Sequence, residues 1–107
     1  MARRQTQVIT AGATAAEGKL GAQEGLLVAR SVLVFVIFNA GTSAGSVLVE
    51  AAHDKNYAGT WALLATVTWA AASKAHQVYI PGPQIAIRVR VVSVTGGTVD
   101  SFVVVQD

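Results

Sequence analysis

The sequence has no cysteine among its 107 residues and little charge, with charged residues at 13% of the total. The absence of cysteine excludes a disulfide framework, a thiolate metal site and a cysteine nucleophile, and it leaves the redox compartment open. Soluble domains average roughly 25% charged residues, so a monomer of this length would normally expose more of them. We therefore expect other subunits to cover part of the surface of this protein.

Long hydrophobic runs and basic clusters are also missing. The longest purely apolar run extends only from Val32 to Phe38, whereas a membrane-spanning helix needs about 20 such residues. The opening MARRQTQVIT has a basic pair but no apolar segment behind it, so it does not read as a secretory signal. The net charge is only +2, and no Lys/Arg run is interleaved with aromatic residues. We expect neither a membrane nor nucleic acid as the partner.

Residues 1–25 differ in composition from the rest of the chain. The stretch AGATAAEGKLGAQEG mixes helix formers with glycines, and each interior glycine weakens a helix by roughly 1 kcal/mol relative to alanine. The stretch also lacks a hydrophobic stripe. We predict a short strand at residues 5–10 and then an extended arm or long loop. The chain is accordingly divided into an N-terminal arm, residues 1–25, and a β-sandwich domain, residues 26–107. The arm is either a flexible tail or a segment that docks on a neighbouring subunit.

The remainder of the chain reads as short strands separated by turn signals. Val32–Phe38 is rich in β-branched residues and apolar on both faces, which predicts a strand buried on both sides, either as a central strand or under a partner. Gly96-Gly97 predicts a tight hairpin turn before the last strand. This spacing predicts an all-β fold, an antiparallel β-sandwich of jelly-roll-like type with about seven or eight strands and the N-terminal arm. Further strands are expected at residues 45–54, 60–69, 75–80, 84–95 and 98–107.

No pattern of residues predicts a catalytic or metal site. His53 precedes Asp54, but neighbours on a strand point to opposite faces, and a zinc site needs three or four converging ligands. The sequence has no nucleophile elbow, no P-loop lysine and no dinucleotide-binding glycine pattern. The spacing of the carboxylates singles out no pair for acid–base work. We expect no enzymatic activity, no metal and no cofactor.

Three aromatic residues near the loop HDKNYAGT allow two interpretations. In the first, Trp61 plugs one end of the core, because a buried tryptophan removes a large apolar area from water. In the second, Tyr57, Trp61 and Trp69 form a stacking platform for a sugar ring.

Three motifs follow one another between residues 45 and 106: SVLVEAAHD, then YAGTWALLATVT, then VYIPGPQIAIRVRVVSVTGGTVDSFVV. This order resembles a small β-sandwich that recurs in virion proteins of tailed bacteriophages, including head decoration (cement) proteins and tail or fibre accessory domains. The chain departs from that pattern at HDKNYAGT, where a tighter turn is common. The same residues are similar, more weakly, to carbohydrate-binding jelly rolls, but most of the aromatic loop residues and the acidic calcium cluster of those modules are missing.

The resemblance implies a structural virion protein. We expect a capsid decoration protein on the outer surface of the head that binds between major capsid subunits and stabilises the head. Its partners would be the major capsid protein or other virion subunits, and it would be a homo-oligomer, with a trimer favoured. One alternative is a carbohydrate-binding module or a receptor-binding fibre accessory domain. Another is a head–tail joining or tail structural protein.

Two arginines lie on one face of the strand predicted at residues 84–95. Arg88 and Arg90 are two positions apart, which places them about 6.6 Å from each other on the sheet. Either they pair within the chain with Glu50, Asp100 or a carbonyl group, or they contact a carboxylate on a neighbouring subunit, because the planar guanidinium suits buried contacts. Arg3 and Arg4 join Arg88 and Arg90 as candidate intersubunit contacts.

Overall fold

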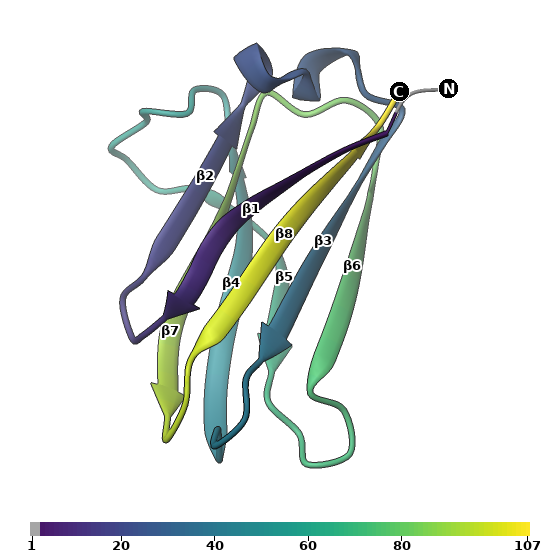
Figure 1. Cartoon of the computed structure of the whole chain (residues 1–107). Helices are drawn as coiled ribbons and strands as arrows, with labels where there is room; N and C mark the ends of the chain where they lie inside the picture. Colours follow the sequence, from purple (N-terminus) through teal and green to yellow (C-terminus); the bar gives the residue numbers. More distant parts are fainter. Residues whose placement is uncertain (1–2) are drawn as a thin grey trace.

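The computed structural model describes residues 3–107, which form two four-stranded antiparallel sheets (Figure 1). Sheet A has the strand order β1-β8-β3-β6 and sheet B the order β2-β7-β4-β5. This interleaved order is that of an eight-stranded jelly roll, so the predicted all-β sandwich is confirmed. The strands are β1 (Arg3–Gly12), β2 (Glu17–Gly21), β3 (Ser31–Phe38), β4 (Ala44–Ala52), β5 (Ala62–Thr68), β6 (Ala75–Pro81), β7 (Ala86–Thr95) and β8 (Val99–Gln106), with two 3-10 turns, η1 (Ala22–Glu24) and η2 (Leu26–Val28).

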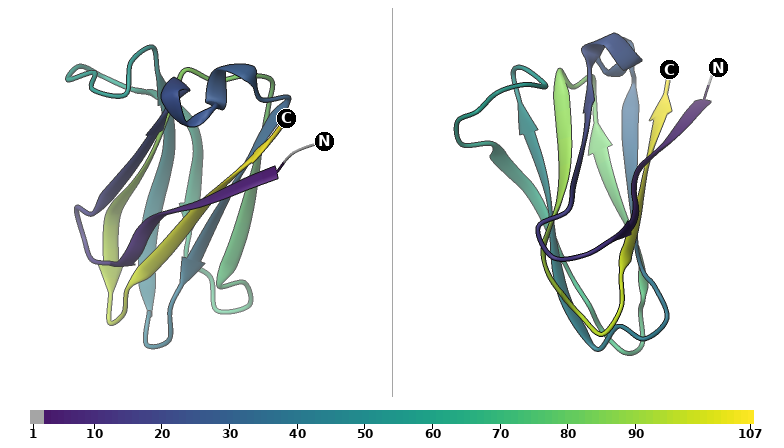
Figure 2. Two further views of the ribbon diagram at one scale, coloured as in Figure 1. Left: turned by 45° about the horizontal axis from the view of Figure 1, so that its top comes forward. Right: turned by 60° about the vertical axis from the view of Figure 1, so that its left-hand side comes forward.

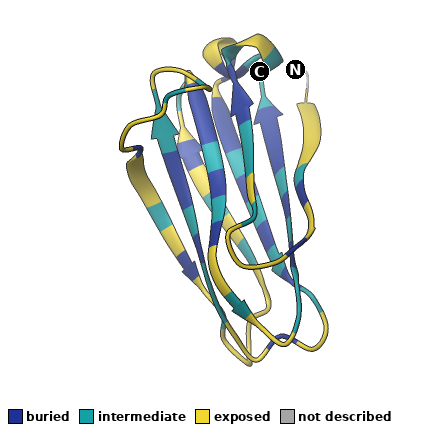
Figure 3. Cartoon of the chain, turned by 90° about the vertical axis from the view of Figure 1, so that its left-hand side faces the viewer, coloured by how far each residue is buried: buried dark blue, intermediate teal, exposed yellow. Residues whose placement is uncertain are grey.

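The hydrophobic core lies between the two sheets. Figure 2 shows the two layers, and Figure 3 shows buried and more exposed positions alternating along the strands. On β3 the inward side chains are Val32, Val34 and Val36, all with 0% exposure. Sheet B contributes Val49 and Val89, which are buried to the same degree. Such alternation follows from the two-residue period of a strand, which sends successive side chains to opposite faces.

Strand β3 is central in sheet A, but only one of its faces is buried within the chain. Its outward residues Leu33, Phe35 and Ile37 are partly exposed. The predicted burial of both faces is therefore confirmed only for the inner face, which packs into the core of this chain. The second apolar face of β3 belongs to the outer surface of sheet A.

The predicted division into an arm and a domain is wrong for the described part of residues 1–25. Strand β1 pairs with β8 from Arg3↔Gln106 to Gly12↔Val99, and β2 pairs with β7. Ile9 and Leu20 from these strands are in the hydrophobic core. Glycine allows close approach here: a Cβ at position 18 would collide with the backbone of Val8. Residues 3–12 and 17–21 are thus two strands of the sandwich.

The helical turns found between Arg3 and Asp107 are too short to cross a membrane.

Candidate functional site

The two arginines of β7 are held by a single carboxylate on the outer face of sheet B. Glu50 on β4 is the cross-strand partner of Arg88. Glu50 Oε1 accepts hydrogen bonds from Arg88 Nη2 at 2.7 Å, from Arg88 Nε at 3.0 Å and from Arg90 Nε at 3.2 Å. Of the pairings considered for these arginines, the one with Glu50 is confirmed. Asp100 lies on β8, in the other sheet.

The carboxylate of Glu50 is almost completely shielded from water, because its side chain is only 7% exposed. Burial raises the pKa of Glu50, but the hydrogen bonds and charges of Arg90 and Arg88 outweigh burial, so its pKa lies below the usual value. The carboxylate therefore stays charged at neutral pH and acts as a cross-strand clamp between β4 and β7.

Trp61 is buried, as one interpretation predicted, but it lies outside the apolar cluster between the sheets. Its ring lies 4.7 Å from Arg88 Cζ and 5.7 Å from Lys19 Nζ, which is within range for cation–π attraction. The indole Nε1 donates a hydrogen bond to the carbonyl of Tyr57 at 3.0 Å. Trp61 thus extends the Glu50 cluster and fixes the loop before β5 onto the outer face of sheet B.

The three residues of the proposed sugar platform do not converge. Trp61 has only 3% of its surface exposed. The whole of β5 separates it from Trp69, a span of roughly 23 Å at about 3.3 Å per residue. The ring of Tyr57 packs against His53 with 4.6 Å between centroids. The described chain therefore offers no single stacking surface built from these residues.

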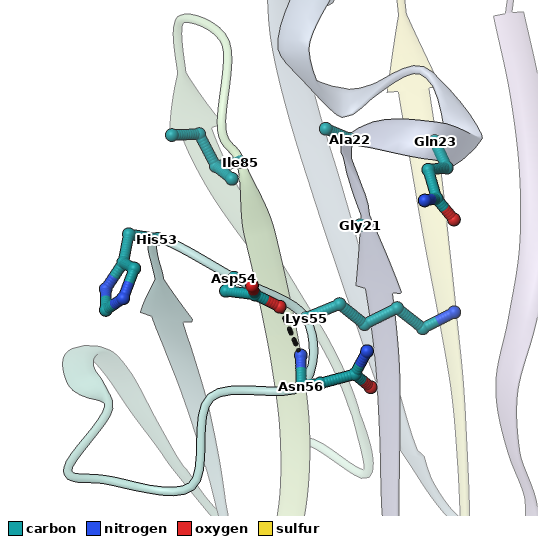
Figure 4. Close-up of a pocket in the computed structure, with 8 residues that line it drawn as sticks. All are labelled: Gly21, Ala22, Gln23, His53, Asp54, Lys55, Asn56 and Ile85. Atoms are coloured by element: carbon teal, nitrogen blue, oxygen red, sulfur yellow. Dashed lines mark hydrogen bonds between the residues drawn. The ribbon is translucent and has the colours of Figure 1, made fainter.

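A small pocket lies where the loop after β4 approaches η1 (Figure 4). It has a volume of about 220 Å³, and its polar lining residues are Gln23, His53, Asp54, Lys55 and Asn56. Asp54 Oδ1 accepts a hydrogen bond from the backbone N–H of Asn56 at 2.8 Å, which shapes the loop. No three His, Asp or Glu side chains converge on a possible metal position within residues 3–107.

The two sides of this pocket are tied together by Glu24. Its Oε1 accepts a hydrogen bond from Lys55 Nζ at 2.8 Å, and its Oε2 accepts one from the N–H of Gly21 at 2.7 Å. The hydrogen bond from Lys55 is the main reason why the pKa of Glu24 is lowered. The ion pair holds the loop after β4 against η1.

The outer face of sheet A carries an apolar surface, which the alternative of burial under a partner anticipated only for residues 32–38. We call it the sheet A patch. Cross-strand partners place Val104, Leu33 and Tyr79 in one row and Phe102 with Phe35 in the next. Tyr79 is 62% exposed. The patch consists of the exposed Tyr79 on β6, the partly exposed Leu33, Phe35 and Ile37 on β3 and Phe102 on β8, and Val104 on β8, which is only 7% exposed.

The sheet A patch is bordered by neutral residues. Gln5 and Gln7 of β1 pair with Val104 and Phe102, and Gln77 of β6 pairs with Phe35. A depression of about 210 Å³ opens on this face. Among the strand residues of this face that the structure describes, charges stand at its ends, where Arg3 pairs with Gln106 and Asp100 with Ile37. The depression is lined by Gln5, Phe35, Ile37, Phe102 and Val104.

The predicted intersubunit contacts differ in how free their side chains are. Arg4 forms an ion pair with Asp107 at 3.2 Å. Arg88 is only 15% exposed and is engaged by Glu50, whereas Arg90 is 37% exposed. Arg3 is exposed at the start of β1. A contact of these residues with another subunit stays a prediction, and Arg88 is the residue least able to make one.

No protein-family model matches this sequence, and no curated protein matches it either. Among solved structures, the chain is similar to the crystal structure of the SPBc2 prophage-derived protein YomS, with a TM-score of 0.67. The two chains share one fold. The similarity covers 97% of this chain and 92% of the YomS chain at 17% sequence identity. At this identity the likeness speaks for the fold, and it includes β1 and β2, which the sequence interpretation had set apart as an arm.

Proposed function

We propose that this protein is a structural component of a bacteriophage particle, without enzymatic activity, and that it decorates the outer surface of the head. The observation that carries the proposal is the sheet A patch, an apolar face whose centre carries no charged residue. The motifs between residues 45 and 106 and the fold shared with a prophage-derived protein support the phage context.

The patch supports an adhesive role because contiguous apolar surface on a soluble protein usually marks a contact. Phe35, Phe102 and Leu33 lie on strands whose other faces form the core, so the surface is preformed and little ordering is needed on binding. On a particle, many copies would act together, and weak contacts per copy would add up through multivalent attachment. The partners under this proposal are the major capsid protein or other virion subunits.

The structure argues against the carbohydrate-binding alternative but does not separate a tail or head–tail role from decoration. A carbohydrate-binding module needs an exposed aromatic platform, and Trp61 is buried while Trp69 lies at the far end of β5. A head–tail joining or tail protein would use an adhesive face in the same way, so only its position within the particle separates that role from decoration.

The test is to delete the gene for this chain from the phage that encodes it, and then to add the purified chain back to the particles. We expect particles made without the gene to assemble but to release DNA at a lower temperature than wild-type particles, as followed by a DNA-binding dye. Adding the purified chain back should restore the wild-type release temperature. Heads that lack tails after deletion of the gene would support the tail or head–tail role. Particles of unchanged stability that bind none of the added chain would contradict the proposal.

A further inference from the structure

We propose that the sheet A patch is the contact between two copies of this chain, which stack face to face about a two-fold axis. This inference goes beyond the particle role and concerns the free chain: the two copies must separate before the same patch can contact a particle. It rests on the composition of the patch, on its shape and on its area.

The composition of the patch selects an uncharged partner surface. Phe35, Phe102 and Leu33 form its centre, with glutamines at its border. A partner that placed a charge against this centre would bury the charge without a counter-charge, at a cost of several kcal/mol. A second sheet A patch meets the requirement, because its centre is apolar and its border amides can donate and accept hydrogen bonds across the contact.

The shape of the patch makes it complementary to itself. The face has a hollow of about 210 Å³ over β8 and β3, and it has a projecting side chain, Tyr79, which is 62% exposed on the edge strand β6. Sheet A has the strand order β1-β8-β3-β6. We place a two-fold axis in the contact plane, midway between β8 and β3 and parallel to the strands. This axis puts β6 of each copy over β1 of the other copy, and β3 over β8.

This placement brings each Tyr79 beside Gln5 at the rim of the other copy's hollow, because Tyr79 and Gln5 lie in the same row of the sheet. The same operation places Phe35 over the other copy's Phe102 and Leu33 over its Val104. Every contact then occurs twice, as an isologous interface requires. Tyrosine suits this position because its ring is apolar while its hydroxyl reaches the polar border.

The area of the patch predicts a reversible dimer. Four strands about 4.8 Å apart and six residues at about 3.3 Å each give a face of roughly 20 Å by 20 Å. Two such faces bury roughly 800 Å² before side-chain relief is added, which is below the ~1,200 Å² of standard specific interfaces and in the range of weak, transient contacts. We expect association in the micromolar range. A face that one partner copy covers completely favours a dimer over the trimer expected from the sequence.

The experiment is sedimentation equilibrium of the full chain over a wide concentration range. Three variants each replace an apolar side chain with lysine: Phe35→Lys and Tyr79→Lys in the patch, and Leu63→Lys as the matched control. Leu63 is 58% exposed on β5 of sheet B. We expect the mass to rise from 11.0 kDa towards twice that value for the wild type and for Leu63→Lys.

Both patch variants should raise the dissociation constant at least tenfold. Tyr79→Lys keeps the test valid if Phe35→Lys fails to fold, because Tyr79 is already largely in water. The wild-type dimer should also persist at high salt, since its contact contains no central charge. A wild-type chain that stays monomeric at millimolar concentration, a trimer, or a dimer unaffected by Tyr79→Lys would overturn the inference. None of these results bears on the particle assay, which uses only the unmodified chain.

Discussion

At the scale of single residues, Glu50 is the side chain on which most interactions of the outer face of sheet B depend. It accepts hydrogen bonds from both Arg88 and Arg90, and Arg88 in turn lies against Trp61. Glu50→Gln would leave Arg88, which is 15% exposed, without its counter-charge. We expect a loss of about 3 kcal/mol in the free energy of unfolding, measured by urea denaturation.

The matched control for this substitution is Glu17→Gln. Glu17 also lies near Arg88, at 3.8 Å, but its side chain is 41% exposed. Exposed pairs contribute less than about 1 kcal/mol. Equal losses for the two variants would contradict the role assigned to Glu50.

The same carboxylate predicts how stability depends on pH. The pKa of Glu50 in the folded protein lies below the value of 4.5 for an unperturbed glutamate. A group of this kind stabilises the fold above its unfolded pKa, and that contribution disappears as the pH falls through the folded pKa. The difference in unfolding free energy between the wild type and Glu50→Gln should therefore be constant near neutrality and shrink below about pH 4.5. A difference that stays constant down to pH 2 would contradict the assignment.

Trp61 gives a direct test of the carbohydrate alternative. The chain has two tryptophans, so Trp69→Phe leaves Trp61 as the single indole reporter. Because Trp61 is 3% exposed, we expect its fluorescence to resist quenching by acrylamide and to be unchanged by added sugars. Trp61→Phe, which reports on the half-buried Trp69, should be quenched more readily. Efficient quenching of Trp61, or a shift of its emission with a sugar, would revive the platform interpretation.

At the scale of elements, the N-terminal strands are as much part of the sandwich as the rest. β1 covers the free edge of β8, and β2 covers that of β7. Deleting residues 1–25 would expose both edges and remove Ile9 and Leu20 from the core. We expect the shortened chain to show no cooperative thermal unfolding by circular dichroism. A sharp transition near the wild-type temperature would restore the arm interpretation. Val28→Ser, at a residue that is 72% exposed, serves as a neutral control.

The strands that the sequence predicted well have either a clear two-residue period or many β-branched residues. β4 and β7 alternate valine and isoleucine with other residues, and their turns are marked by glycine or proline. β3 was predicted from its β-branched residues, because both of its faces are apolar. β1 was predicted only at residues 5–10, because it is exposed over most of its length and is interrupted by two register shifts. β2 was not predicted as a strand. β2 is short and contains Gly18, whose role in the close approach to Val8 has no sequence signature.

The candidate sites were predictable only in part, because strand register cannot be read from one sequence. Glu50 was among the possible partners of Arg88, but only the pairing of β4 with β7 selects it. Burial of Trp61 was foreseen, although its place against the outer face was not. The sheet A patch was anticipated only on β3, where burial of residues 32–38 under a partner was one of two alternatives. Its extension over β8 and β6 was not predicted, because it depends on which strands pair with β3. Phe102 and Val104 alternate with the inward-facing valines of β8, so β8 also has apolar residues on both faces. Apolar residues on both faces of these two strands were the sequence pattern that indicated the patch.

At the scale of the whole molecule, the sandwich is flattened, with extents of 37 × 32 × 19 Å, and its two broad faces differ in chemistry. The outer face of sheet A is apolar and neutral, while that of sheet B carries the Glu50 cluster with Arg88 and Arg90. Both termini lie at the same end, where Arg3 pairs with Gln106 (Figure 1). A tag at either terminus should therefore leave the opposite end and the centres of both faces accessible.

The proposed place of this protein, on the head of a phage particle, can be tested directly. Quantitative mass spectrometry of purified particles, with heads and tails separated before digestion, measures where the chain is and how much of it is present. We expect peptides of this chain in the head fraction, in a molar amount comparable to that of the major capsid protein. Absence of the chain from purified particles, while it is present in the infected cell, would rule out a role in the particle.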